Sequence, residues 1–199
     1  MSESIYGDKL PRMREILEDM QARIAKVRRQ AEGVTGMDPV EHSLGRIKSE
    51  ESMREKCRRK GLPETAESAL TEIRDAIGLR IVCAFLNDVY LIRDYLASEP
   101  DLTIVTEKDY IRHAKPNGYR SYHLVVRTAD GFFVEFQLRT ISMDTWAALE
   151  HHLKYKKNLQ GNIDLIAAEL KRCAEELAST DVSMQTLRDM IIEGNGADI

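Results

Sequence analysis

The sequence contains little cysteine, and its cysteines are scattered. Cys57, Cys83 and Cys173 are odd in number, and no C-x-x-C pair occurs. A disulfide framework or a zinc knuckle would need paired or closely spaced cysteines. The sequence therefore argues against both, and the pattern is typical of a protein that is kept in the reducing cytoplasm.

Long apolar runs are also missing. No window approaches the ~18–20 consecutive apolar residues that a membrane-spanning helix needs, and residues 1–16 lack the charged-then-apolar design of a signal peptide. Hydrophobic residues still make up 43% of the 199 residues, and charged residues make up 31%. This composition predicts a soluble globular protein with a proper core and no membrane partner, built as one domain or as one domain with a helical appendage.

Charge of one sign is not abundant overall, but it is unevenly distributed. The net charge is −4, yet residues 46–60 hold seven Lys/Arg against three Glu. Residues 108–127 hold five Lys/Arg and two His against one Asp, whereas residues 162–199 hold three basic and eight acidic residues. Two basic clusters in an acidic chain favour a local anionic ligand over a broad nucleic-acid surface. Solvated surface is the simpler explanation of such runs.

Hydrophobic periodicity predicts a sheet with helices before and after it. A helix is expected over 9–31 and a basic helix from an N-cap at Ser49 to about residue 60, with Arg46 and Lys48 in the loop before it. Strands are expected at 78–85, 101–107, 122–127 and 132–139, and further helices at 88–98, 141–157, 163–177 and 184–191. Residues 78–107 read as a crossover unit and Asp130-Gly131 as a hairpin turn. The predicted class is α/β or α+β, with a mixed sheet of about four to five strands.

The strand at 132–139 carries a row of polar residues. Strand side chains alternate, so Glu135, Gln137 and Arg139 share the face opposite the apolar residues. A solvated sheet face would explain this row, but Asp75, directly before another strand, offers a second carboxylate. Mg²⁺ takes one or two carboxylates and completes its shell with water and phosphate oxygens. A turn cap beside Gly78 is the alternative role for Asp75.

The basic helix offers ligands for phosphate. Ser52, Lys56 and Arg59 are spaced to share one helical face, and Arg46 and Lys48 precede the helix. The N-terminus of a helix also binds phosphate through its free N–H groups. No Walker or Rossmann glycine motif occurs, so a phosphate site in this chain would be of another kind.

The segment KDYIRHAKPNGYRSYH, residues 108–123, gathers tyrosines and positive charges around a turn. Gly118 permits a sharp turn, which would display Tyr119 for stacking on a planar base. Lys115, Arg120 and His123 would then reach the phosphates or the sugar. A nucleotide has both an aromatic face and an anionic tail, which accounts for the mixed composition. A basic surface loop that packs on its own tyrosines is the alternative.

Four blocks together resemble the synthetase domain of the RelA/SpoT family: GRIKSEES, IRDAIGLRIVC, HAKPNGYRSYH and VEFQLRTISMDTWAALEHHLKYK. The overall length resembles the single-domain members, the small alarmone synthetases, so neither a preceding hydrolase domain nor a following regulatory tail is expected. The resemblance implies a nucleotidyltransferase-like synthetase fold. It divides the chain into an N-terminal helical segment (1–37), a synthetase domain (38–158) and C-terminal helices for oligomerisation (159–199).

Such enzymes transfer the β,γ-pyrophosphate of ATP to the 3′-hydroxyl of GDP or GTP, with Mg²⁺ as cofactor, giving AMP and ppGpp or pppGpp. Carried over by position, the resemblance implies a role for each candidate residue. The ATP contacts would be Arg46 and Arg80 around the adenine, with Lys48, Ser52, Lys56 and Arg59 toward the phosphates. The acceptor contacts would be Tyr119 on guanine, Lys115 and His123 on phosphates, and Asn117 and Gln137 beside them. Asp75 and Glu135 would bind Mg²⁺, and Glu135 would also orient or deprotonate the acceptor 3′-hydroxyl. Glu150 and His151 would give structural support.

Other functions fit the same residues. The chain could be a catalytically silent module that binds guanine nucleotides, or a synthetase that uses an adenosine nucleotide or tRNA as acceptor. Binding of single-stranded RNA through the two basic clusters could coexist with catalysis. The resemblance also favours a homotetramer, with the apolar stripes of the C-terminal helices covered by other subunits.

Overall fold

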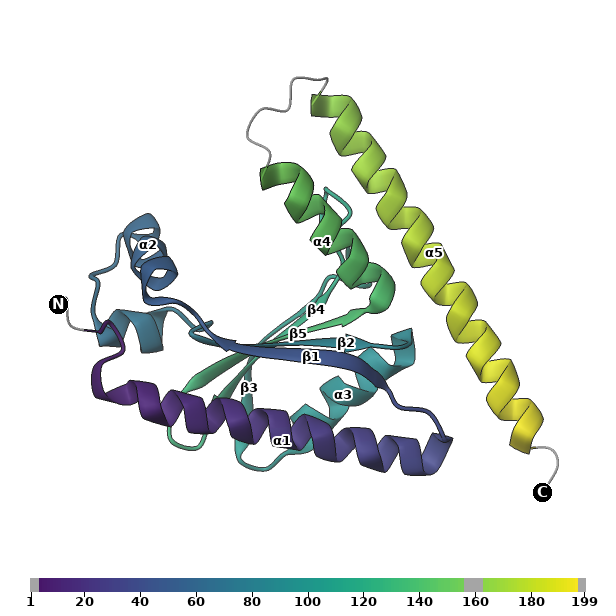
Figure 1. Cartoon of the computed structure of the whole chain (residues 1–199), viewed down its shortest axis with the longest axis horizontal. Coiled ribbons are helices and arrows are strands. Elements are labelled where there is room, and N and C mark those ends of the chain that lie inside the picture. The colour runs from purple at the N-terminus through teal and green to yellow at the C-terminus, as the bar shows by residue number, and fades with distance from the viewer. Residues whose placement is uncertain (1–3, 156–162, 197–199) are drawn as a thin grey trace.

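A computed structural model of the protein describes residues 4–155 and 163–196. A five-stranded sheet of order β1-β2-β5-β4-β3 lies at its centre, with helices on both faces (Figure 1). The strands are β1 (Val40–Ile47), β2 (Ile77–Cys83), β3 (Leu102–Asp109), β4 (Tyr122–Thr128) and β5 (Phe133–Thr140). The helices are α1 (Leu10–Thr35), α2 (Glu50–Lys60), α3 (Leu86–Ser98), α4 (Ile141–Tyr155) and α5 (Ile163–Gly196), with a short 3-10 helix (Gly7–Lys9) and a π-helix (Ser68–Glu72). The predicted mixed sheet with flanking helices is confirmed.

The sheet is mixed because one central pair of strands is parallel. β2 pairs with β5 in parallel, and the three other pairs are antiparallel. β2 and β3 therefore run in the same direction and are joined through α3, as the crossover prediction requires, although β5 and β4 lie between them. The predicted β4–β5 hairpin is also present, with the Phe132 carbonyl accepting from the Thr128 N–H at 2.9 Å and a positive φ at Gly131.

Two sequence predictions about elements are wrong. Residues 40–47 form the edge strand β1, so Arg46 lies on a strand, and its mostly exposed, polar sequence hid that strand from a hydrophobic pattern. Residues 163–196 form one helix where two were expected. The Ser and Thr residues at its centre are accommodated within the helix, where the hydroxyls of Thr180, Ser183 and Thr186 donate to carbonyls four residues earlier.

The boundaries of the C-terminal segments fall partly outside the described residues. The predicted end of the 141–157 helix and the division at 158/159 both lie in the undescribed stretch between 155 and 163. The division of the chain into 1–37, 38–158 and 159–199 stays a prediction.

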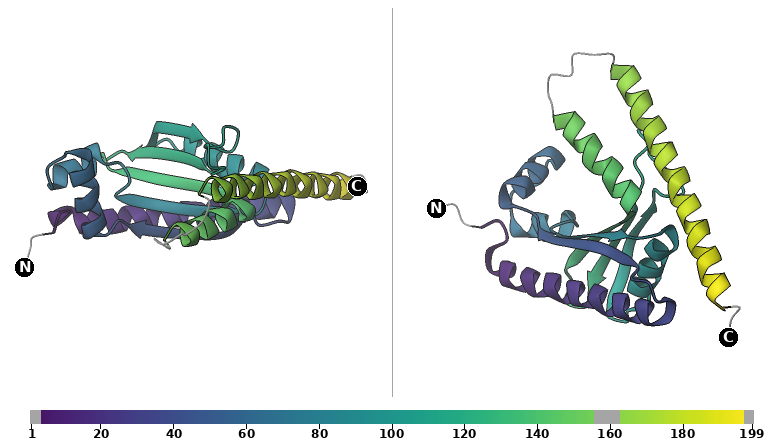
Figure 2. Two further views of the ribbon diagram at one scale, coloured as in Figure 1. Left: turned by 90° about the horizontal axis from the view of Figure 1, so that it is seen from above. Right: turned by 45° about the vertical axis from the view of Figure 1, so that its right-hand side comes forward.

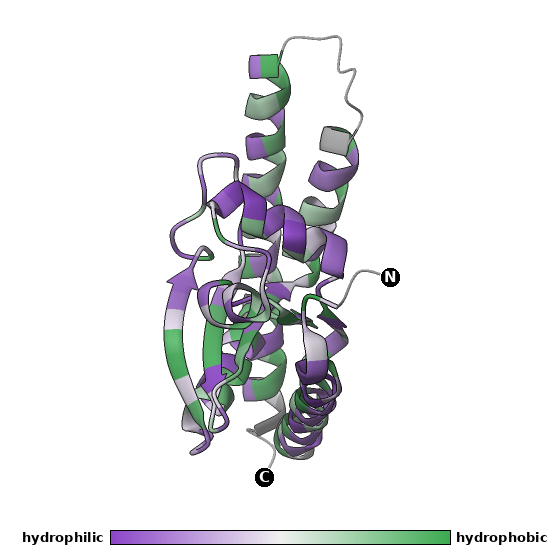
Figure 3. Cartoon of the chain, turned by 90° about the vertical axis from the view of Figure 1, so that its left-hand side faces the viewer, coloured by the Kyte–Doolittle hydropathy of each residue, from purple (hydrophilic) through white to green (hydrophobic). Residues whose placement is uncertain are grey.

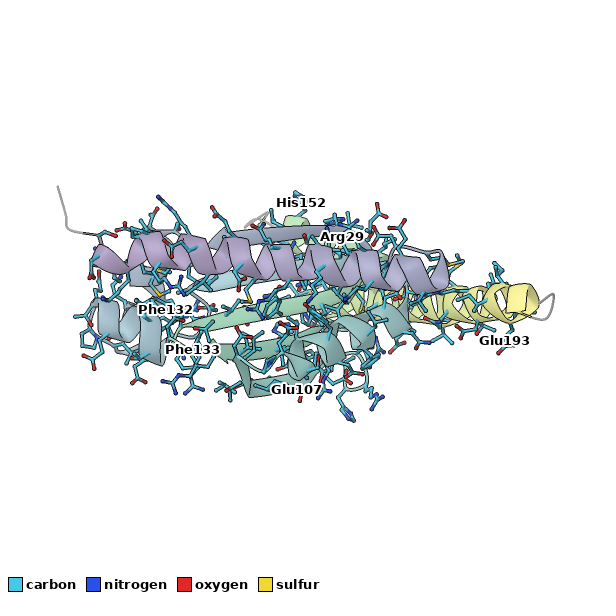
Figure 4. All side chains as sticks on the ribbon, turned by 90° about the horizontal axis from the view of Figure 1, so that it is seen from below. Arg29, Glu107, Phe132, Phe133, His152 and Glu193 are labelled. Atoms are coloured by element: carbon cyan, nitrogen blue, oxygen red, sulfur yellow. The ribbon has the colours of Figure 1, made fainter. Side chains whose placement is uncertain are left out.

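The hydrophobic core lies between one face of the sheet and the helices α1 and α3. α1 runs lengthwise across that face (Figure 4) and contributes the buried Met13, Ile16 and Met20. In β5 the alternation is strict, because Val134, Phe136 and Leu138 are fully buried in this core while the residues between them point to the other face. The core face thus leaves the polar row of β5 on the opposite side of the sheet.

That opposite side carries α2 and α4 (Figure 1). α2 is largely hydrophilic (Figure 3), and Ser49 caps it as predicted by accepting from the Ser52 N–H at 3.4 Å. α5 packs against α4 and extends beyond the sheet (Figure 2). Within residues 4–155 and 163–196, no helix is both long and apolar enough to cross a membrane.

Candidate active site

A cavity of about 200 Å³ lies on the polar side of the sheet, over β1, β2 and β5. It is lined by Leu44, Arg46, Lys48, Asp75, Gly78, Leu79, Arg80, Glu135 and Gln137, and we call it the strand cavity. The parallel register of β2 and β5 places Gly78 beside Glu135 and Arg80 beside Gln137. Asp75, just before β2, thereby comes to the same cavity as Glu135, and this is the arrangement on which the predicted site depends.

Asp75 is held by two lysines. Its Oδ2 atom lies 3.0 Å from the Lys48 Nζ and 2.5 Å from the Lys56 Nζ. Burial raises the pKa of Asp75, but the two ammonium groups outweigh this effect and hold its pKa below the ordinary value. Its other oxygen, Oδ1, is buried and has no hydrogen-bond partner among the described residues. A buried anionic oxygen of this kind is suited to bind a cation.

Glu135 has a different set of partners. Its Oε1 lies 3.6 Å from the His123 Nδ1, and its Oε2 accepts from the Gln137 amide at 3.3 Å. Burial raises the pKa of Glu135, and the nearby Asp75 charge does so too, but the contacts with His123 and Gln137 outweigh both and lower it overall. The carboxylate is therefore ionised at neutral pH and held by groups on its own strand and on β4.

The two carboxylates fit a magnesium ion. Asp75 and Glu135 come from separate segments, line one cavity and include a buried oxygen without a partner. Mg²⁺ usually keeps several waters and binds through one or two carboxylates together with substrate phosphates. In the described part of the chain no group of three or more His, Cys, Asp or Glu could hold a metal by itself, so a metal here would depend on the substrate for further ligands.

A second cavity, of about 520 Å³, adjoins the first. It lies between the sheet and α4, is called here the helix cavity, and is lined by Arg46, Arg80, Tyr119, Arg139, Ala147, Ala148, Glu150, His151 and His152. Arg46 and Arg80 line both cavities. Burial lowers the pKa of Arg80, and the neighbouring Arg139 charge lowers it further. Asp144 offsets this repulsion, since its Oδ1 lies 3.0 Å from an Arg139 nitrogen and 3.5 Å from an Arg80 nitrogen.

Tyr119 lies in a cluster of aromatic and cationic side chains. Its hydroxyl accepts from Arg139 at 2.9 Å and lies 2.8 Å from the His123 Nε2. Its ring meets those of Tyr110 and Trp146 edge to face. The Lys115 Nζ lies 4.6 Å from the ring centres of both Tyr110 and Tyr119. The Lys115 ammonium group therefore lies over the Tyr119 ring, where a stacked base would lie. Stacking of a base on this side of the ring requires Lys115 to move aside.

The structure brings together some predicted site residues and not others. The strand cavity is shared by six of them, namely Arg46, Lys48, Asp75, Arg80, Glu135 and Gln137. Lys56 does not line this cavity but pairs with Asp75, and His123 likewise contacts Glu135. Ser52 and Arg59 are exposed on α2 and line neither cavity. Arg120, expected near the ligand, instead donates to the Ile111 carbonyl at 2.6 Å and braces its own loop.

The residues of α4 have a more direct place than expected. Glu150 and His151, interpreted as structural support, line the helix cavity, and Glu150 also accepts from the Asn117 amide at 3.3 Å. Asp144 was missed by the sequence reasoning. An acid in the first turn of a helix reads as an ordinary partner for the helix dipole. Its contact with two arginines depends on β2 and β5 lying side by side.

On an open α/β sheet, lysines and arginines lie around a pair of carboxylates and next to a tyrosine. This is the arrangement of an α/β protein that is suited to bind phosphorylated ligands. The particular family is given by comparison with known proteins. The family model described as "Region found in RelA / SpoT proteins" matches residues 45–160, more than half of the chain. The chain belongs to this family.

Known proteins match most of the length of this chain. GTP pyrophosphokinase YjbM of Bacillus subtilis is 35% identical over 92% of this chain and 89% of its own length. GTP pyrophosphokinase YwaC of the same organism is 38% identical over 80% of this chain and 79% of its own. The crystal structure of the small alarmone synthetase 1 from Bacillus subtilis bound to its product pppGpp has a TM-score of 0.76 and 33% identity, and covers 90% of this chain and 94% of its own.

Proposed function

We propose that this protein is a GTP pyrophosphokinase. It transfers the β,γ-pyrophosphate of ATP to the 3′-hydroxyl of GDP or GTP and releases AMP and ppGpp or pppGpp. The observation that carries the proposal is the strand cavity, which Asp75 and Glu135 line together with Arg46, Lys48 and Arg80. The names of the relatives that match most of the chain support the same activity.

The donor is held by the basic side of the strand cavity. Arg46 and Arg80 come from neighbouring strands, and their planar guanidinium groups suit an adenine ring between them. Lys48 and Lys56, which both pair with Asp75, bind the triphosphate. ATP binding thus gives the lysines new anionic partners and frees Asp75. Ser52 and Arg59, on the exposed side of α2, join only if that helix moves toward the donor.

The acceptor approaches from the side of Tyr119. Its guanine stacks on the Tyr119 ring once Lys115 moves to the acceptor phosphates, where His123 also contributes. Asn117 and Gln137 border this path. Glu135 is placed on a rigid strand and ionised, so it orients the 3′-hydroxyl and takes its proton. The hydroxyl oxygen forms a bond to the β-phosphorus of ATP, and the bond from that phosphorus to the oxygen of the α-phosphate breaks, so that AMP leaves.

Positioning and charge supply most of the catalysis in this type of reaction. Asp75 and Glu135 would hold Mg²⁺, which when bound neutralises charge on the phosphates. The arginines and lysines of the cavity neutralise the rest. Arg139 holds Tyr119 through its hydroxyl, while Asp144 keeps Arg139 and Arg80 in place despite their like charges.

The protein also has apolar surface for self-association. Large hydrophobic side chains are exposed on α4 and α5, namely Ile141, Leu149, Leu153, Ile163, Leu165, Val182, Met184, Leu187, Met190, Ile191 and Ile192. We propose that the protein forms a homotetramer in which other subunits cover these helices. We also propose that it works in the cytoplasm.

Product analysis tests the proposed activity. The protein is incubated with Mg²⁺, ATP labelled on its γ-phosphate, and GDP, GTP, ADP or tRNA in turn, and products are separated by anion exchange. We expect label on a guanosine tetraphosphate or pentaphosphate, with one AMP formed for each. Label on an adenosine nucleotide or tRNA would instead identify another acceptor. Tight GDP binding without AMP formation would show a silent binding module.

A further inference from the structure

The turn at residues 116–119 is packed directly against the C-terminal helix. Gly118 is buried and has a φ of +91°, a backbone conformation that residues other than glycine rarely adopt. A Cβ added to Gly118 would lie 2.6 Å from the Ala174 Cβ and 3.2 Å from the Lys171 Cα. The glycine is therefore required twice, once for the turn itself and once for close contact with α5.

The same turn is held by its neighbours on α4. The Asn117 amide donates to Glu150, and the Tyr119 ring lies 6.4 Å, centre to centre, from the buried Trp146 ring. The Trp146 indole in turn donates to the Leu170 carbonyl of α5 at 2.8 Å. Tyr119 is thus connected to α5 both through Gly118 and through Trp146.

α5 is itself anchored to α3 and to the end of β5. Arg188 forms a buried ion pair of 2.6 Å with Asp88 of α3, with side-chain exposures of only 7% and 2%. Thr140, at the end of β5, donates to Asp181 at 2.6 Å. Buried polar pairs of this kind allow little sliding, because a displaced partner would leave an unpaired charge in the core. The helix surface that meets Gly118 therefore has a defined position.

We propose that α5 is a positioning element for the acceptor nucleotide. Ala174 and Lys171 fix the position of the 116–119 turn, and hence of the Tyr119 ring on which the acceptor stacks. The inference rests on the acceptor role proposed above for Tyr119. The effect falls mainly on the acceptor, because Ala174 meets the turn at Gly118, whereas Arg46 and Arg80 lie on β1 and β2 and Lys48 directly follows β1. Ala174 acts through the turn and is a positioning residue, not a catalytic one.

Enlarging Ala174 tests the proposal. Ala174→Leu pushes the turn away from its place, and a displacement of about 1 Å can cost a factor on the order of a hundred in rate. We expect the KM for GDP to rise at least ~10-fold while the KM for ATP changes less than ~2-fold. Ala168→Leu, at an exposed position of the same helix, is the matched control and should leave both unchanged.

Binding provides a readout that does not depend on turnover. GDP affinity is measured by calorimetry for the wild type and each variant, so the proposal is tested even if the wild type makes no alarmone. Trp146 is the only tryptophan in the sequence, and its emission reports whether the contact with α5 has changed. We expect Ala174→Leu to weaken GDP binding by the same factor as its KM and to shift the Trp146 emission. A shift of emission with unaltered GDP affinity would overturn the proposal.

A reciprocal pair of variants separates contact from backbone strain. Gly118→Ala introduces both backbone strain and a collision with Ala174. Ala174→Gly removes the Cβ with which the new methyl group collides. We expect the double variant to recover part of the GDP affinity that Gly118→Ala loses. Ala174→Val replaces Ala174→Leu if the latter does not fold. Equal losses for ATP and GDP, or no loss for GDP in a folded variant, would show that α5 has only a structural role.

Discussion

The donor side and the acceptor side of the site are built in different ways. Besides Arg46 and Arg80, the donor side contains Lys48, Lys56 and Asp75. These three form ion pairs between α2 and the segments that follow β1 and precede β2. The acceptor side consists of Tyr119 and its turn, held by ring contacts and by packing against α4 and α5. Ion pairs can exchange one anion for another with little movement, whereas a packed turn must be displaced to change. The donor side is therefore suited to exchange the Asp75 carboxylate for substrate phosphate, and the acceptor side is suited to select an acceptor by its shape.

The largest effect is expected where the two sides meet. Glu135→Gln keeps the size of the side chain and one acceptor oxygen but removes the charge and with it the base. We expect the rate of synthesis to fall by a factor of ~10²–10⁴, the usual contribution of a general base, with ATP and GDP still bound by calorimetry. Near-normal turnover in this variant would rule out the role of Glu135.

A crossed pair of variants should separate the two sides. Arg80→Leu removes a guanidinium from the donor cavity, and Tyr119→Ala removes the ring proposed for the acceptor. Base stacking is worth about 1–3 kcal/mol, so we expect the KM of one substrate to rise on the order of tenfold in each variant. Steady-state kinetics should show the larger ATP effect for Arg80→Leu and the larger GDP effect for Tyr119→Ala, since Arg80 also lines the helix cavity beside Tyr119. Arg14→Leu, on the exposed surface of α1, is the control, and equal effects on both substrates would contradict the division.

The pH dependence of activity should reveal the contact between His123 and Glu135. This contact lowers the pKa of Glu135, and the base must be ionised to act. His123→Gln removes the contact, so the pKa of Glu135 rises and more carboxylate is protonated at a given acid pH. The acid limb of kcat/KM should therefore move to higher pH than in the wild type, whatever the loss in absolute rate. An acid limb that stays in place would show that His123 does not tune Glu135.

The smallest effect concerns the N-terminal segment that supports the donor side. The buried Tyr6 hydroxyl donates to the Lys48 carbonyl at 2.7 Å. A single hydrogen bond contributes about 0.5–1.5 kcal/mol to stability, so Tyr6→Phe should raise the KM for ATP by at most roughly tenfold and leave the KM for GDP unchanged. Tyr122→Phe, which loses a bond to Glu107 far from Lys48, should not change the KM for ATP. Equal ATP kinetics in Tyr6→Phe and the wild type would argue against this support.

Local pattern was enough to predict most of the elements and to single out several of the residues that line the strand cavity. Alternation along β5 separated Val134 and Phe136 from Glu135 and Gln137, and the structure places the first pair in the core and the second in the strand cavity. The position of Asp75 before β2 could likewise be read from the sequence. These features depend on residues one or two apart, and the period of a strand connects such residues directly.

The sequence by itself determined which faces are apolar, where the two basic clusters lie and that Asp75 and Glu135 are available. Only the tertiary structure decided that residues 40–47 add an edge strand, that Asp144 lies between two arginines, and that Gly118 touches Ala174. The reason is physical. Periodicity reports the neighbours of a residue along the chain, whereas these contacts join segments that meet only after the sheet has formed and the C-terminal helices have packed against it.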